Sequence, residues 1–245
     1  MRRVSTTFSF SLPDWLYGPA KRFWMRQTQS SGADKPNLLG DRDIEWSWVA
    51  ANIPNGSGFA LDFGPGGSYL GLIAAHRGFH VQALDREILD WPFVHPNLAA
   101  VRGDILTSPL PKKRFDLVLN CSTVEHVGLA GRYGATDARP EGDLEAMSLL
   151  RTTMKSGGIM LLTIPVGKDG VFPPLARVYG DKRLPLLLRG FNVEEEEYWI
   201  KDTRNKWVKA GRTEALGREA FAGSWDPMKN YYGIGCFILK PSRKK

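Results

Sequence analysis

The residues in this sequence best suited to chemistry lie in a glycine-rich segment, residues 61–68. It contains, in order, Asp62, Phe63, Gly64, Pro65 and Gly66. Glycines allow a backbone to turn tightly and to approach a ligand without a side chain in the way. A helix that begins after such a turn offers unpaired N–H groups to a polar ligand. We therefore expect these residues to bind a small cofactor.

A dinucleotide is one alternative ligand, and its fingerprint is G-x-G-x-x-G. Gly64 and Gly66 fit this pattern, but Tyr69 occupies the third glycine position. A bulky residue there would obstruct the close packing that a pyrophosphate requires. Asp62 would also repel phosphates, whereas it suits a cationic amino group such as that of S-adenosylmethionine.

Two further acids follow the next predicted strands. Asp85 lies 23 residues after Asp62, close to the spacing of about 20 for an acid that binds ribose hydroxyls. Asp104 follows the third predicted strand and could accept the exocyclic amine of an adenine. Arg86 and Ile105 adjoin these two acids. Acids at three successive strand ends should face one crevice.

A polar segment follows the fourth predicted strand. Asn120 and Ser122 could line the same cofactor, whereas Cys121 is expected to pack. His126 is the first candidate for a general base, because an imidazole titrates near neutral pH. The alternative is a structural histidine that caps the turn. Glu125 is expected to order the loop or a neighbouring group.

Aromatic and cationic residues beyond this segment are candidates for the acceptor site. Loops at the carboxyl ends of strands usually carry specificity in such sheets. Arg132 and Arg177 could clamp a phosphate or carboxylate, and Tyr133 and Tyr179 lie beside them in sequence. The alternative is that these are surface arginines and packed tyrosines.

The predicted elements explain how these residues come together. Apolar runs alternate with helical patterns, which is typical of a parallel sheet with helices on both faces. The predicted strands are 59–63, 79–84, 98–102, 115–119 and 159–164, and the predicted helices are 43–53, 68–76 and 143–154. On the first helix, Ile44, Trp48 and Ala51 are expected to face the core.

The tail has a different pattern. Residues 191–200 and 233–240 read as strands, and the long polar segment between them has no convincing helical pattern. An antiparallel pair that closes the sheet is the simplest interpretation. The charged run Glu194–Glu197 is expected on a solvated strand edge. The sequence thus predicts a doubly wound α/β fold with a mostly parallel, seven-stranded sheet.

With these motifs in this order, residues 43–165 resemble class I S-adenosylmethionine-dependent methyltransferases. The similar segments are 61–66 to their first motif, 84–85 to the second, 103–105 to the adenine-contacting motif, 115–120 to the fourth-strand motif and 154–158 to the turn before the fifth strand. The resemblance implies a Rossmann-like methyltransferase fold, S-adenosyl-L-methionine as the cofactor, and methyl transfer as the activity. No metal site is predicted.

The polar segment implies something about the acceptor. Residues 122–129 and 131–134 resemble an uncharacterised bacterial branch of these enzymes, often encoded near surface-polysaccharide genes. This resemblance implies a sugar or glycolipid acceptor. We therefore expect methyl transfer to a small-molecule or glycan acceptor, on a hydroxyl oxygen. The family often has Glu-His where Glu125 and His126 stand.

The charge of the chain leaves other functions open. Its formal net charge is +7, from 33 basic and 26 acidic residues, so an RNA methyltransferase is possible on charge alone. Against it, residues 120–123 differ from the Asn/Asp-Pro-Pro-aromatic turn of base N-methylating enzymes, and no separate RNA-binding module stands out. A non-catalytic cofactor-binding protein of the same fold is the third possibility.

Other features predict the compartment. The only cysteines, Cys121 and Cys236, cannot form a disulfide framework and suit a reducing environment. No apolar run is long enough to span a bilayer. Polar residues interrupt the segment after Arg3, so we predict no secretory signal. We expect a cytoplasmic protein.

Residues 1–36 read as an aromatic and basic appendage with a linker, before a catalytic domain at 37–245. The apolar members are Trp15, Leu16, Tyr17, Phe23, Trp24 and Met25, and Lys21, Arg22 and Arg26 are interleaved with them. These aromatic residues could pack as a lid over the acceptor site. They could instead lie on an anionic membrane surface, where each basic residue contributes about 1 kcal/mol. Pro13, Gly18 and Pro19 interrupt an amphipathic helix and favour the lid.

Deleting residues 1–30 distinguishes the two roles. For a lid, neither form sediments with anionic vesicles at physiological salt, and the deletion abolishes acceptor turnover because the site is left open. The lid is wrong if the full chain sediments with vesicles while the truncated chain stays in solution and active.

Overall fold

The computed structural model describes residues 41–131, 133, 135–136, 138–204, 206–219 and 232–242. The predicted appendage, residues 1–36, and its boundary with the domain at 37–245 lie outside the described residues and stay predictions. Within the described part of the chain, no helix is long and apolar enough to cross a bilayer.

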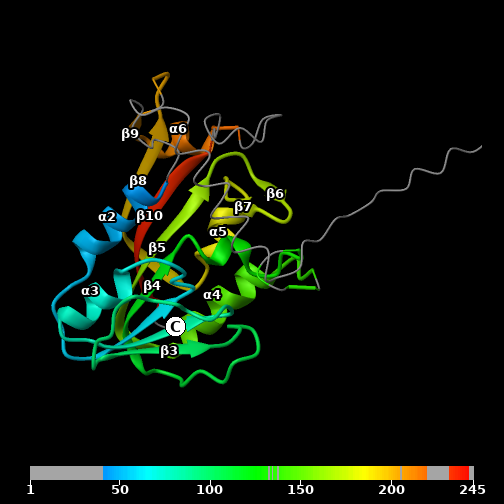
Figure 1. The fold of residues 1–245 in the computed structure, drawn as a ribbon. Coiled ribbons are helices and arrows are strands. Elements are labelled where there is room, and N and C mark those ends of the chain that lie inside the picture. Colours follow the sequence, from blue (N-terminus) through cyan, green and yellow to red (C-terminus); the bar gives the residue numbers. More distant parts are fainter. Residues whose placement is uncertain are drawn as a thin grey trace, which may run out of the picture. The chain divides into compact units, whose positions relative to one another are not determined.

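The central feature is one eight-stranded sheet with the order β3-β2-β1-β4-β5-β10-β8-β9 (Figure 1). Its strands are β1 (Phe59–Phe63), β2 (His80–Asp85), β3 (Leu98–Arg102), β4 (Phe115–Cys121), β5 (Met154–Val166), β8 (Phe191–Lys201), β9 (Trp207–Ala210) and β10 (Gly233–Pro241). Neighbouring strands from β3 to β5 are parallel. Strand β10 is antiparallel to both β5 and β8. The predicted fold class, with its antiparallel C-terminal pair, is therefore confirmed.

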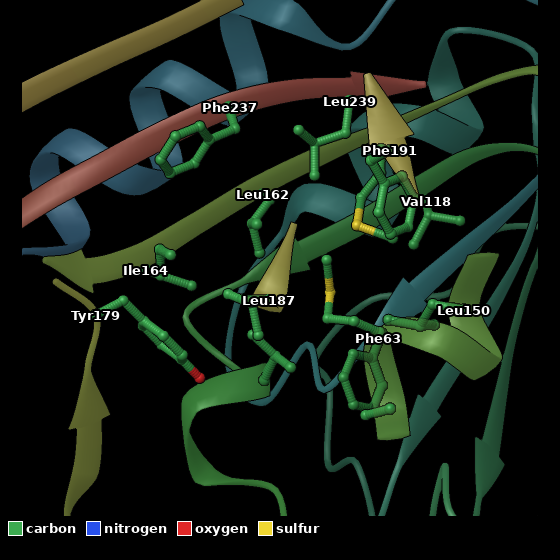
Figure 2. Close-up of a cluster of buried hydrophobic side chains, with 14 of the residues drawn as sticks. Phe63, Val118, Leu150, Leu162, Ile164, Tyr179, Leu187, Phe191, Phe237 and Leu239 are labelled. Atoms are coloured by element: carbon green, nitrogen blue, oxygen red, sulfur yellow. The ribbon is translucent and has the colours of Figure 1, made fainter. Parts of the chain in front are cut away.

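Helices cover both faces of this sheet. Helices α2 (Arg42–Asn52) and α3 (Leu70–His76) lie on one face, and α4 (Gly142–Thr153) and α5 (Arg183–Leu187) lie on the other (Figure 1). Side chains alternate between the faces along each strand, so two separate cores form. Figure 2 shows the core on the α4 face, where Leu150 and Leu187 meet Val118 and Leu162.

The strand count differs from the expected seven because β9 pairs with β8 at the sheet edge. This four-residue strand lies in the segment that we predicted to be irregular, and α6 (Arg212–Leu216) follows it. A separate hairpin, β6 (Gly170–Phe172) and β7 (Ala176–Val178), was also missed. Elements this short carry too few residues for a periodic signal. Strand β9 pairs only with the last four residues of β8. The Glu194–Glu197 run, which precedes them in β8, therefore lies on a solvated strand edge as predicted.

Two crossovers lack the helices that alternation predicts. Residues 86–97 and 103–114, which are all described, connect β2 to β3 and β3 to β4 without a helix. As a result, four of the five residues of β3 are exposed. The core of the sheet is therefore centred on β1, β4, β5 and β10.

Helix α2 buries most of the face expected and one acid besides. Trp48 is buried and Ile44 packs against the same core, as predicted, whereas Ala51 is exposed and Glu45 and Val49 are buried. The prediction missed Glu45 because it counted only apolar residues as inward. A carboxyl group thus lies under the first turn of α2.

The carboxyl ends of the parallel strands gather the polar residues at one edge. Because β10 runs against β5, Tyr232 at its beginning lies at this same edge. Strand β8 runs against β10, so its last residue, Lys201, also lies there. The edge therefore carries residues from β1, β2, β4, β5, β10 and β8.

Candidate functional site

The glycine-rich turn after β1 is built as its sequence predicts. Gly64 and Gly66 have φ of +64° and +52°, a region that other residues rarely adopt. A Cβ on Gly64 would lie 2.1 Å from Cγ2 of Thr123. Thr123 Oγ1 lies 3.0 Å from the Gly64 carbonyl, which ties the turn to the segment after β4. The turn is thus held by a close contact and a hydrogen bond to Thr123.

Asp62 lies directly beneath this turn, and its side chain is 1% exposed. Its Oδ2 has no hydrogen-bond partner among the described residues. Burial raises the pKa of Asp62 to about 7, the nearby Asp85 carboxylate raises it as well, and a backbone N–H of Gly71 lowers it. A Cβ on Gly71 would lie 2.7 Å from this oxygen. The turn therefore holds a buried acid that a cation would ionise.

Asp85 and Asp104 lie at the ends of their strands, as predicted. Asp85 accepts the Gly66 N–H at 3.1 Å and the Glu87 N–H at 2.9 Å. Asp104 accepts the Leu106 N–H at 2.9 Å and pairs with Arg86 at 3.3 Å. Asp85 contacts the turn and raises the pKa of Asp62, so both aspartates lie beside the turn.

Several predicted cofactor residues present no side chain to this crevice. Phe63 and Ile105 are 6% and 4% exposed and pack in the core on the α4 face, where Figure 2 shows Phe63. Asn120 is fully buried, its Nδ2 lies 3.5 Å from Met147 Sδ, and its Oδ1 has no hydrogen-bond partner in the described part of the chain. Phe63 and Ile105 can contact a ligand only through their backbones.

An aromatic group beside the turn was missed from the sequence. Trp91 donates from Nε1 to the Gly66 carbonyl at 2.9 Å. Its ring stacks on Phe93 at 5.0 Å, and Phe93 lies 5.2 Å from Tyr69. Tyr69 is half exposed. The available signal was the run of aromatic residues shortly after Asp85.

The segment after β4 forms a short polar chain. Ser122 donates to Glu125 Oε1 at 2.6 Å, and Glu125 lies on the 3-10 helix η1 (Val124–His126). His126 Nδ1 lies 2.6 Å from the Leu175 carbonyl oxygen. Because a carbonyl oxygen can only accept a hydrogen bond, Nδ1 carries the hydrogen in this contact. His126 Nε2 lies 3.5 Å from Glu125 Oε1. A proton gained at Nε2 would therefore face a carboxylate.

Arg177 and Tyr179 do not face a ligand in this structure. They are 1% and 0% exposed. Arg177 donates to the carbonyls of Glu125, Val127, Arg139 and Pro140 at 2.6–3.3 Å. Their polar atoms hold η1 and the residues before α4 in place, and their contact with an acceptor stays a prediction. Tyr133 is half-buried and lies 5.7 Å from the His126 ring, whereas Arg132 lies outside the described residues.

Asp143 organises this buried polar cluster. Its carboxylate is fully buried at the start of α4. It accepts Arg183 at 2.5 and 2.9 Å and the Tyr179 hydroxyl at 3.1 Å, and it pairs with Arg177 at 3.6 Å. Asp143 was missed because an acid in a first helical turn usually faces solvent.

Comparisons with known proteins establish the fold. The model of a family described as "Caenorhabditis protein of unknown function, DUF268" matches residues 110–207, less than half of the chain. No curated protein matches the sequence.

Solved structures match at low identity. A 1,6-didemethyltoxoflavin-N1-methyltransferase from Burkholderia thailandensis, bound to S-adenosylhomocysteine, is 13% identical over 97% of this chain and 94% of its own, with a TM-score of 0.52. An S-adenosylmethionine-dependent methyltransferase from Archaeoglobus fulgidus is 15% identical over 89% and 99%, with a TM-score of 0.54. The [4+2]-cyclase SpnF is 15% identical over 82% and 81%, with a TM-score of 0.56. The chain has the fold of these proteins.

The Asp143 cluster generates a stability prediction. Arg177→Met should lower the free energy of unfolding by about 3–5 kcal/mol, because it leaves buried polar groups uncompensated. Arg139→Met is the matched control. Its side chain pairs with Glu145 at the surface, and such pairs contribute about 0–1 kcal/mol. Urea unfolding measures both. Equal stability of the two variants would contradict the structural role of Arg177.

Proposed function

We propose that this protein transfers a methyl group from S-adenosyl-L-methionine to a small-molecule or glycan acceptor. The observation that carries the proposal is the buried Asp62 carboxyl under a fixed glycine-rich turn. Its Oδ2 lacks a hydrogen-bond partner in the described part of the chain. Ionising a buried carboxyl group with an unsatisfied oxygen is costly, and the Gly71 N–H offsets that cost only in part. A cationic amino group supplies the missing partner.

The other residues around the turn fit the rest of this cofactor. Asp85 ends β2, where a ribose acceptor is needed, and it is half-buried. Asp104 and the backbone of Ile105 follow β3 and suit the adenine. Gly64, Pro65 and Gly66 supply the turn. The bound cofactor would provide an electrophilic methyl group on a sulfonium ion.

The acceptor is proposed to be a hydroxyl group, with His126 as its base. The support is the orientation of the ring: Nδ1 is held by the Leu175 carbonyl and Nε2 lies beside Glu125. Glu125 would orient the ring and balance its charge when Nε2 takes up a proton. The Burkholderia neighbour, named for methylation of 1,6-didemethyltoxoflavin, is an example of this fold acting on a small molecule.

The location proposed is the cytoplasm. Its support is that Cys121 and Cys236 are free thiols, which suits a reducing compartment. An anionic membrane surface remains a proposed partner of residues 1–36, and RNA is a less favoured acceptor. The cyclase among the structural neighbours illustrates that one fold hosts different reactions, so cofactor binding must be measured directly.

Cofactor binding should depend on Asp62 and Asp85. Asp62→Asn and Asp85→Asn should each weaken the binding of S-adenosylhomocysteine by about 1.5–3 kcal/mol, or roughly 10- to 150-fold in the dissociation constant. This is the value of a hydrogen bond to a charged group. Isothermal titration calorimetry measures the effect. Unchanged affinity in both folded variants would rule out the proposed site.

The pH dependence of this binding identifies the acid. The pKa of Asp62 is about 7 in the free protein, and the cationic ligand favours its ionised form. Wild-type affinity should therefore rise with pH, by up to about tenfold per unit, and level off near pH 7. Asp62→Asn should remove this slope between pH 5 and 7. A slope that survives in this variant would assign the titration to another group.

Acceptor turnover tests His126. A product screen with labelled S-adenosylmethionine, offered sugar nucleotides, lipid extract and RNA in separate reactions, identifies the acceptor. On that acceptor His126→Ala should lower turnover by about 10²–10⁴-fold, the usual loss for a general base, with cofactor affinity unchanged. Turnover within a few-fold of wild type would return His126 to a structural role, and labelled RNA alone would favour the RNA methyltransferase.

A further inference from the structure

A second buried acid, Glu45, lies at the same edge of the sheet as the proposed cofactor site. It projects from the first turn of α2 and is 1% exposed. Thr163 on β5 donates to its Oε1 at 3.1 Å, and Arg42 donates to its Oε2 at 3.0 Å. Neither the glycine-rich turn nor the Ser122–Glu125–His126 chain uses this group.

Glu45 belongs to a row of polar residues on the α2 face. Cys121 on β4 is paired with Thr163 on β5, and their Sγ and Oγ1 atoms lie 3.4 Å apart. On the adjacent β1, Asp62 is in register with Leu119, so it precedes Cys121 by one step on the same face. The row therefore runs from Asp62 through Cys121 to Thr163 and Glu45.

The charges in this row place Cys121 between the two acids. Cys121 is half-buried, and the pKa of its thiol is raised by burial and by both Glu45 and Asp62. A ligand anchored by its amino group at Asp62 and extended along the row would thus approach Glu45. S-adenosylmethionine extends in this way, with the sulfonium beyond a short aliphatic chain from the amino group.

Several groups face Glu45 from the surrounding elements. Burial raises the pKa of Glu45 to about 8, Asp41 and Glu125 raise it further, and Arg42 and Thr163 lower it. From β10, Tyr232 and Cys236 are influenced by Glu45, and both stay protonated near neutral pH because their own pKa values are raised. Arg42 is the cation among the groups that act on Glu45, and it must also balance Asp41 and Glu125.

We propose that the Glu45 carboxylate faces the sulfonium end of the bound cofactor and makes the site prefer S-adenosylmethionine to S-adenosylhomocysteine. The inference rests on the proposed function and deepens it. When the acceptor oxygen bonds to the methyl carbon, the carbon–sulfur electron pair remains on sulfur and the proton leaves to His126. The cofactor then becomes a neutral thioether, which no longer attracts Glu45. Glu45 is thus a specificity-determining residue that favours entry of the donor over retention of the product.

The test compares the two ligands by calorimetry across pH, with no acceptor present. Both ligands place the same amino group at Asp62, so this contact largely cancels in the ratio of dissociation constants, and any effect of the sulfonium on the ligand's own amino group is the same in Glu45→Gln. Glu45 is mostly protonated below pH 8 in the free protein, and only the sulfonium favours its ionisation. In wild type, the preference for S-adenosylmethionine should therefore rise by about tenfold or more between pH 6 and 8 and then level off.

Glu45→Gln should make this preference independent of pH and reduce it by about tenfold or more at pH 8.5. Asp43→Asn, in the same turn of α2 and exposed, is the matched control and should behave as wild type. Glu125→Gln identifies the titrating group, because it should retain the rise. If Glu45→Gln fails to fold, the wild-type ratio decides alone.

Two results overturn the inference. One is a ratio that does not change with pH in wild type, and the other is a rise that is kept in Glu45→Gln. Both leave the proposed function standing, since both ligands still bind. Failure of either ligand to bind would instead overturn the proposed function.

Discussion

The geometry of the candidate site depends on the buried carboxylate of Asp143. It joins the beginning of α4 to Arg177, Tyr179 and Arg183, and Arg177 extends the network to four backbone carbonyls. Two of those carbonyls, of Glu125 and Val127, belong to the segment that carries His126, and the other two precede α4. Buried ion pairs often add little net stability, because desolvation offsets their attraction. What this network provides is a single conformation for a segment that contains little regular structure.

The opposite face of the sheet follows a different rule. Asp62 and Glu45 are buried there, and burial is the largest cause of the raised pKa of each. A folded state that holds protons more tightly than the unfolded chain loses stability as pH rises. For these acids the loss begins near pH 4 and extends to about pH 8. A cationic ligand offsets this loss, because it stabilises the ionised carboxylates.

The sequence analysis succeeded where an acid or a glycine follows an apolar strand. Asp62, Asp85 and Asp104 could be located because parallel strands bring their carboxyl ends to one edge. It failed where burial depends on tertiary contacts. Glu45 and Asp143 occupy first helical turns, where acids are usually solvated, and Arg177 and Tyr179 belong to residue types that are common on surfaces. Their burial follows from partners far away in sequence, Thr163 for Glu45 and Asp143 for the other two, which no local pattern reveals.

Buried charges form an ion-paired network on the α4 face, whereas the buried acids of the α2 face have raised pKa values. This difference affects which substitutions the chain can tolerate. On the α4 face every substitution in the Asp143 network removes a partner and lowers stability. Harmful variants there should therefore be present at lower levels in the cell. On the α2 face, replacing Asp62 or Glu45 by a neutral isostere relieves a cost that burial imposes. Such variants should be abundant yet impaired in the proposed cofactor binding, the pattern of a trade-off between stability and function. A mutational scan that records abundance and activity separately would therefore divide this one domain into two halves along the plane of its sheet.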